Sequence, residues 1–276
     1  MGLKKYYLDM RTLVGNAISD FKESLNLNEH IIDVTKNQDS VYFKESETDG
    51  TGMIYQDGTR LYHDLGDNNN LFFGKNAGNL TSGGGGGFGS NIGIGSNTLQ
   101  YLGAGQFNVG IGTNAVQGWD NPGAFGGNGN VGVGVQAVRN ITSGSNNIGI
   151  GESSLYGGSG AVTGGDNVAV GSAAGYSVTS GSQNTYLGHN AGLSVSSGSG
   201  NVFIGHDAGK SVAGGTSNTL IIENTNDSAT PLITGNFDTK TLTFNVTNLN
   251  LTGLPTSASG LASGDVWNNS GVLTIV

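Results

Sequence analysis

The chain of 276 residues contains 51 glycines, 3 prolines and no cysteine, and its net charge is −9. Irregular glycine spacing with so little proline excludes a collagen triple helix, and the recurrence of branched apolar residues argues against disorder. Without cysteine there is neither a disulfide framework nor a cysteine-ligated metal. The excess of acidic over basic residues argues against nucleic-acid binding. The sequence contains no run of about 18 apolar residues, so we expect no insertion into a membrane.

Residues 1–67 are expected to form a separate N-terminal attachment module, because they hold 19 of the 31 charged groups. The first ten residues lack the apolar segment of a secretory signal, so we expect synthesis in a cytoplasm without export. Apolar residues recur every three or four positions from Met10 to Leu25, which predicts an amphipathic helix. Two strand-like runs follow, and Asp57-Gly58 predicts a hairpin turn. The runs are His30–Thr35 and Ser40–Lys44, and the hairpin is Met53–Tyr62.

Residues 68–222 carry an internal repeat in which an asparagine is followed four positions later by a glycine. Five of the eight intervals between asparagines are 17 residues long, and the other three contain insertions. The repeat anchors are Asn70, Asn91, Asn108, Asn130, Asn147, Asn167, Asn184 and Asn201 with a degenerate ninth at Asn218, and Gly74, Gly95, Gly112, Gly134, Gly151, Gly171, Gly188 and Gly205. A fixed period of this kind is typical of a solenoid.

Each position of the repeat has its own residue preference. The first and third residues after the asparagine are mostly Val, Ile or Leu, which predicts a strand whose apolar side chains point inward. The fourth-position glycine predicts a turn with positive φ, and a small residue at the seventh position predicts a second short strand. We therefore expect a mainly β protein, a parallel β-roll or solenoid of about nine coils and roughly 40 Å in length.

So slim a coil buries little apolar surface, whereas ordering so many glycines costs much conformational entropy. These two effects predict a homotrimer. The second position after the asparagine lies on the opposite face from the Val and Ile residues, so we expect it to face the trimer axis. It holds Gly93, Gly110, Gly132, Gly149 and Ala169 in the middle, and Phe72, Tyr186, Phe203 and Leu220 towards the ends.

The repeats at residues 70–222 resemble the head repeats of trimeric autotransporter adhesins, with a longer period. This resemblance implies a trimeric parallel β-roll. Pro231–Phe244 resembles the segment that follows similar repeats in tail-fibre-like proteins of Bacteroidetes and their phages. Gly253–Ser257 with Gly264–Val276 resembles the closing hairpin of many tailed-phage structural proteins. Residues 223–276 are therefore expected to form a C-terminal β segment.

No motif predicts catalysis or cofactor binding. Gly127–Gly132 matches a dinucleotide fingerprint by composition alone, and the acidic residues fall in different repeat positions rather than in pairs. His189 and His206 occupy the same position in successive coils and are predicted to stack, with Asp207 beside them. Because that position otherwise accepts many residue types, we expect no metal there, and these histidines are weak candidates. No catalytic residue, cofactor or metal is predicted.

These observations favour a structural fibre or spike of a tailed bacteriophage virion that contributes to host-surface attachment. A bacterial surface adhesin and a virion-associated glycan depolymerase are the alternatives. Residues 1–67 are expected to bind other virion proteins. Side loops of the repeats would contact a host glycan or protein, and Trp119 and Phe125 are the candidates for that contact.

Overall fold

The computed structural model of the chain describes residues 41–45, 52–56, 59–63, 70–78, 89–101, 103–119, 126–225, 230–270 and 272–275. These residues form strands and turns and no helix. Within the described ranges no helix is long and apolar enough to cross a membrane. The predicted helix Met10–Leu25 and the predicted strand His30–Thr35 lie outside the described residues.

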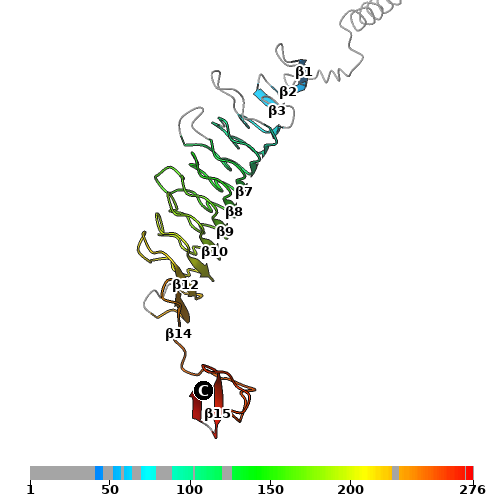
Figure 1. Ribbon diagram of the computed structural model, residues 1–276. Helices are drawn as coiled ribbons and strands as arrows, with labels where there is room; N and C mark the ends of the chain where they lie inside the picture. Colours follow the sequence, from blue (N-terminus) through cyan, green and yellow to red (C-terminus); the bar gives the residue numbers. More distant parts are fainter. Residues whose placement is uncertain are drawn as a thin grey trace, which may run out of the picture.

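Three antiparallel strands lead into the repeats. They are β1 (Val41–Glu45), β2 (Gly52–Gln56) and β3 (Thr59–His63). Gln56 pairs with Thr59, so β2 and β3 close on a two-residue connection, which confirms the predicted hairpin. Strand β3 then pairs antiparallel with β4, so that one sheet runs from β1 into the repeats (Figure 1).

Nine short parallel strands stack in register and form one face of a slender solenoid (Figure 1). Nine stacked strands bound about eight turns of the solenoid, so the prediction of about nine coils was one too many. The ninth repeat carries Ile222 where the others carry glycine, and the chain turns back there. The strands are β4 (Leu71–Phe73), β5 (Ile92–Ile94), β6 (Val109–Ile111), β7 (Val131–Val133), β8 (Ile148–Ile150), β9 (Val168–Val170), β10 (Thr185–Leu187), β11 (Val202–Ile204) and β12 (Thr219–Ile222).

The last strands are antiparallel. β13 (Ile233–Asn236) and β14 (Thr241–Phe244) extend the large sheet beyond β12. β15 (Val266–Asn269) and β16 (Val272–Ile275) form a separate two-stranded hairpin. Two antiparallel pairs therefore follow the solenoid, and a hairpin lies within Gly264–Val276, as expected.

A buried ladder of asparagine side chains runs through the solenoid. Asn147 shows its pattern. Its Nδ2 donates to Asn130 Oδ1 at 3.1 Å and to Gly164 O at 2.9 Å, and its Oδ1 accepts from both nitrogens of Asn167. Each side chain thus joins two coils and also closes its own coil. All eight anchors are buried: Asn70, Asn91, Asn108, Asn130, Asn147, Asn167, Asn184 and Asn201.

The ladder ends one residue away from the predicted ninth anchor. The backbone nitrogen of Thr219, not of Asn218, donates to Asn201 Oδ1 at 3.1 Å. Asn218 instead directs its amide to the Asp238 carboxylate, at 2.9 and 3.1 Å. Because the last interval contains one extra residue, the assignment of Asn218 as an anchor was wrong.

The glycines at the fourth position make the turn that was predicted. Gly95 has φ of 132°, and a Cβ placed there would lie 2.6 Å from the carbonyl oxygen of Gly112 in the next coil. Both the backbone conformation and the close approach of the coils therefore require glycine.

The side of the strands that faces the coil interior is the reverse of the prediction. The second residue of each strand is buried, whereas the first and third are exposed or half-buried. The space beside the strand is too narrow for an additional layer of Val and Ile: a Cβ added at Gly132 would lie 2.7 Å from Val116 Cγ2 and 2.8 Å from Ala137 O. The second position therefore points into its own coil, and the inference that it faces a trimer axis was wrong.

Inside the coil, a large side chain at one position is matched by a small one at a second position six residues away. An aromatic residue at the second position is followed six residues later by glycine, and a glycine is followed by Leu or Val. The pairs are Phe72/Gly78, Tyr186/Gly192 and Phe203/Gly209, and Gly93/Leu99, Gly110/Val116, Gly132/Val138 and Gly149/Leu155. A Cβ on Gly209 would lie 2.6 Å from Phe203 Cε2. Each of these seven coils thus holds one large side chain at one of the two positions. The coil of β9 has Ala169 and Gly175 there, and Tyr186 and Leu155 of the neighbouring coils approach Gly175.

The second strand predicted for each coil is absent from the described repeats. The residues around the seventh position alternate into the left-handed region, as at Asn97 (φ 55°) and Leu99 (φ 50°). Backbone hydrogen bonds still join the coils there, for example from Leu155 N to Ala174 O at 2.9 Å. The chain must curl tightly on this side, and alternating positive φ angles achieve this where an extended strand would not.

We predict that Asn147→Ala destabilises the solenoid by about 3 kcal/mol, because it leaves buried polar groups on two neighbouring coils without partners. Asn128→Ala is the matched control. Asn128 is exposed and accepts a single bond from the Gln106 backbone, so its loss should cost about 1 kcal/mol or less. Urea unfolding measures both changes, and equal effects would contradict the importance of the ladder.

We also predict that Phe203→Gly and Gly209→Leu compensate for each other. The first leaves a cavity and the second overpacks the coil, and each alone should cost about 3 kcal/mol or more. The double variant recreates the arrangement of Gly93 and Leu99, so it should be at least about 2 kcal/mol more stable than the sum of the single effects. Denaturant unfolding of all four proteins tests this, and simple additivity would show that the two positions do not share space.

Candidate functional site

A stripe of mostly apolar side chains runs along the outer face of the parallel strands. We call it the apolar stripe, and it comprises the first and third residues of each strand from β4 to β11, of which Thr185 alone is polar. In-register pairing stacks Ile94 on Ile111 and Ile150 on Val170. The isoleucines Ile92, Ile94, Ile111, Ile148 and Ile150 are between 36% and 42% exposed, and Phe73 is 56% exposed. Large contiguous apolar patches on a protein surface commonly mark interaction sites.

Of the two aromatic residues predicted to contact a receptor, the structure describes only Trp119. Trp119 is half-buried at the start of the insertion in its coil, and its backbone nitrogen donates to Ile141 O at 3.2 Å. Phe125 lies outside the described residues. The structure does not bring them together into a described site.

A hollow of about 560 Å³, which sequence reasoning missed, lies beside the insertion in the coil of β8. The rings of Tyr156 and Tyr176 stack at 4.9 Å, and the Arg139 guanidinium lies over Tyr156 at 5.5 Å from the ring centre. The rest of the lining is Gly157–Gly160 with Ser177, Thr179 and Ser196, which offer hydroxyl and backbone groups. The only sequence signal was the three-residue insertion itself.

One buried ionisable group lies inside the coil. The hydroxyl of Tyr186 is buried and has no hydrogen-bond partner among the described residues. Neighbouring Asn201 already donates its amide to Asn184 and Thr216. Burial raises the pKa of Tyr186 above its usual range, and Asn201 offsets only part of that effect. The phenol therefore remains neutral.

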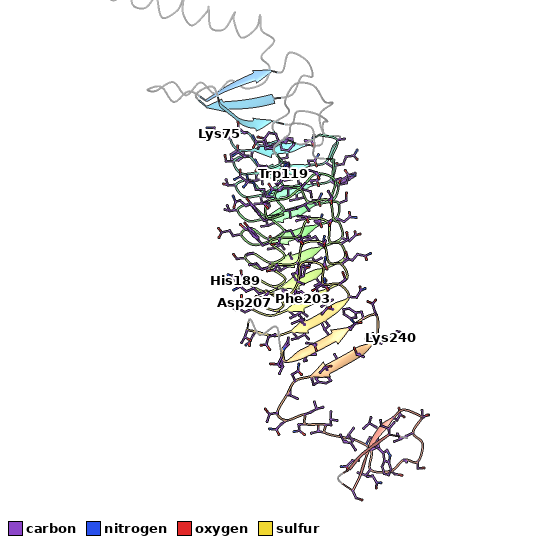
Figure 2. The ribbon with its side chains drawn as sticks, turned by 90° about the vertical axis from the view of Figure 1, so that its left-hand side faces the viewer. Lys75, Trp119, His189, Phe203, Asp207 and Lys240 are labelled. Carbon is purple, nitrogen blue, oxygen red and sulfur yellow. The ribbon has the colours of Figure 1, made fainter. Side chains whose placement is uncertain are left out.

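The two histidines stack as predicted. His189 and His206 come from successive coils, their ring centres are 5.1 Å apart and their planes differ by 16°. Asp207 lies between them: its Oδ1 is 3.8 Å from His189 Nδ1 and its Oδ2 is 3.7 Å from His206 Nδ1. Figure 2 shows His189 and Asp207 along the same edge of the solenoid as Lys75.

The carboxylate of Asp207 has two further partners. Asn190 Nδ2 donates to Oδ1 at 2.8 Å and Lys210 Nζ to Oδ2 at 3.1 Å. Desolvation raises the pKa of Asp207, but the hydrogen bonds from Asn190 and Lys210, with the nearby charges of His206 and Lys210, outweigh it. The net result is a lowered pKa. The group is therefore a carboxylate at neutral pH, held in a fixed orientation.

Comparison of the chain with protein-family models, with curated proteins and with solved structures finds no match.

Proposed function

We propose that the protein is a structural fibre of a tailed bacteriophage virion, a homotrimer that packs along the apolar stripe and contributes to host-surface attachment. The observation that carries this proposal is the stripe itself, which continues over successive strands of a slender solenoid (Figure 1). A fibre subunit needs an elongated shape and a continuous surface along which other copies can pack. The slender solenoid provides the first, and the apolar stripe provides the second.

The stripe supports assembly because the coil interior does not bury it. From β4 to β11 the inner position of each strand holds glycine, alanine or a single aromatic ring, and the Val and Ile residues on either side of it remain outside. Covering these side chains with another copy would stabilise the assembly by about 25 cal/mol for each Å² of apolar surface removed from water. In a trimer, the two columns of the stripe pack against two different neighbours around a common axis.

The remaining parts of the chain have separate roles in this proposal. Residues 1–67, which are rich in charge, attach the fibre to other virion proteins. The solenoid and residues 223–276 project outward. The insertions in the solenoid coils, including those at Trp119 and beside Tyr156, contact a glycan or protein of the host surface. The chain is made in the host cytoplasm and leaves it as part of the particle.

Electron microscopy with an antibody against residues 126–225 tests the assignment to a virion. We expect label on fibres that project from phage particles. Label on the surface of cells that carry no particles would overturn the proposal in favour of a bacterial adhesin.

We predict that Ile150→Glu converts the trimer to a folded monomer at micromolar concentration, because it places a charge in the middle of the apolar stripe. Ile150 is 42% exposed in the single chain, so the coil itself tolerates the change. Sedimentation velocity measures the assembly, and circular dichroism confirms folding.

Thr113→Glu is the control for Ile150→Glu. Thr113 is exposed but lies outside the stripe, so this variant should remain trimeric. A wild-type protein that sediments as a folded monomer at micromolar concentration, or an Ile150→Glu variant that assembles like wild type, would contradict the proposed interface.

A further inference from the structure

We propose that His189, His206 and Asp207 bind one divalent first-row transition-metal ion, of the class of Zn²⁺, Ni²⁺ or Cu²⁺, and that this ion joins two successive coils. All three ligands come from one chain, so the proposal stands whether or not the fibre assignment is correct. It departs from the sequence-based expectation that this position holds no metal.

The donor atoms lie at distances that suit a common ion. Each of the three residues offers one ligand atom, a ring nitrogen from each histidine and a carboxylate oxygen from Asp207, and these three atoms lie within 4.8 Å of one another. Tetrahedral binding with bonds of about 2.1 Å places donors about 3.4 Å apart. His189 Nδ1 lies 3.8 Å from Asp207 Oδ1 and His206 Nδ1 lies 3.7 Å from Asp207 Oδ2, and both separations are close to that value. Small side-chain rotations therefore bring three ligands onto one ion.

The solenoid holds these residues in place before any ion binds. The backbone nitrogen of Asp207 donates to His189 O at 2.8 Å, which fixes the two coils relative to each other at this turn. Asn190 Nδ2 donates to Asp207 Oδ1 and so fixes the orientation of the carboxylate. Outer partners of this kind commonly orient metal ligands.

The type of donor selects the class of metal. Imidazole nitrogen with one carboxylate suits Zn²⁺, Ni²⁺ and Cu²⁺, whereas Ca²⁺ and Mg²⁺ require sets of oxygen ligands. Both histidine side chains are at least half exposed, at 50% and 60%, so the ion reaches them from solvent. Three protein ligands leave a coordination position for water.

Lys210 competes with the ion for the same carboxylate. Its ammonium group lies 3.1 Å from Asp207 Oδ2, and the ion must displace it. This competition makes the proposal testable in both directions. Removal of a histidine should weaken metal binding, and removal of the lysine charge should strengthen it.

Isothermal titration calorimetry of the full chain with ZnCl₂ tests the proposal. We expect saturation at one ion per chain, an affinity at least tenfold weaker in His189→Ala and in His206→Ala, and an affinity several-fold tighter in Lys210→Met. His63→Ala is the control for adventitious binding by histidine, because His63 lies in β3, far along the chain from the cluster. It should bind like wild type.

Electron paramagnetic resonance of the Cu²⁺-loaded protein identifies the ligands directly. We expect coupling to two imidazole nitrogens in the wild type and to one in His206→Ala. Absence of saturable binding would overturn the proposal. So would equal affinities in wild type and His189→Ala, or binding that is lost in His63→Ala.

Discussion

The buried asparagine ladder is the interaction on which the rest of the structure depends. At Asn147, for example, Oδ1 accepts from the side-chain amide and the backbone nitrogen of the next asparagine, Asn167, and Nδ2 donates to the carbonyl oxygen of Gly164 in its own coil. In a buried site an unpaired amide costs about 1–3 kcal/mol, so every rung requires its neighbours. The ladder therefore holds successive coils in register despite insertions of different length, and each repeat position becomes a continuous line along the solenoid.

The narrowness of the coil then decides where the apolar side chains go. The close approach of neighbouring coils at Gly95 and the tight curl near Leu99 leave little space beside the inner strand position. The Val and Ile residues at the first and third positions of the strands therefore lie on the outside, whereas others such as Ile141 and Val162 fill the rest of the interior. The apolar stripe is consequently exposed in one copy, and we infer that contacts between copies cover it.

Much of this arrangement could be predicted from the sequence, and the rest could not for identifiable reasons. The repeat, the positive φ at Gly95, the hairpin of β2 and β3 and the stacking of His189 on His206 followed from period and spacing. The alternation of apolar residues along a strand does not show which face lies inside, and the prediction that the first and third residues after the asparagine point inward was wrong. The alternation of Phe203 with Gly209 and of Gly93 with Leu99 contained the answer, because only residues that share space compensate in size. The positive φ of Leu99 and the orientation of Asp207 by Asn190 depend on the folded coil and leave no local signal.

The rate at which a thiol reagent labels Ile150→Cys tests most directly whether the apolar stripe is covered by other copies. The wild-type chain contains no cysteine, so each engineered thiol reports alone. Glu152→Cys, two residues further along in the adjacent turn, provides the rate for an exposed site. We predict that Ile150→Cys in the native assembly reacts at least tenfold more slowly than Glu152→Cys. Equal rates at every protein concentration would show that the stripe is open to solvent and would contradict the account.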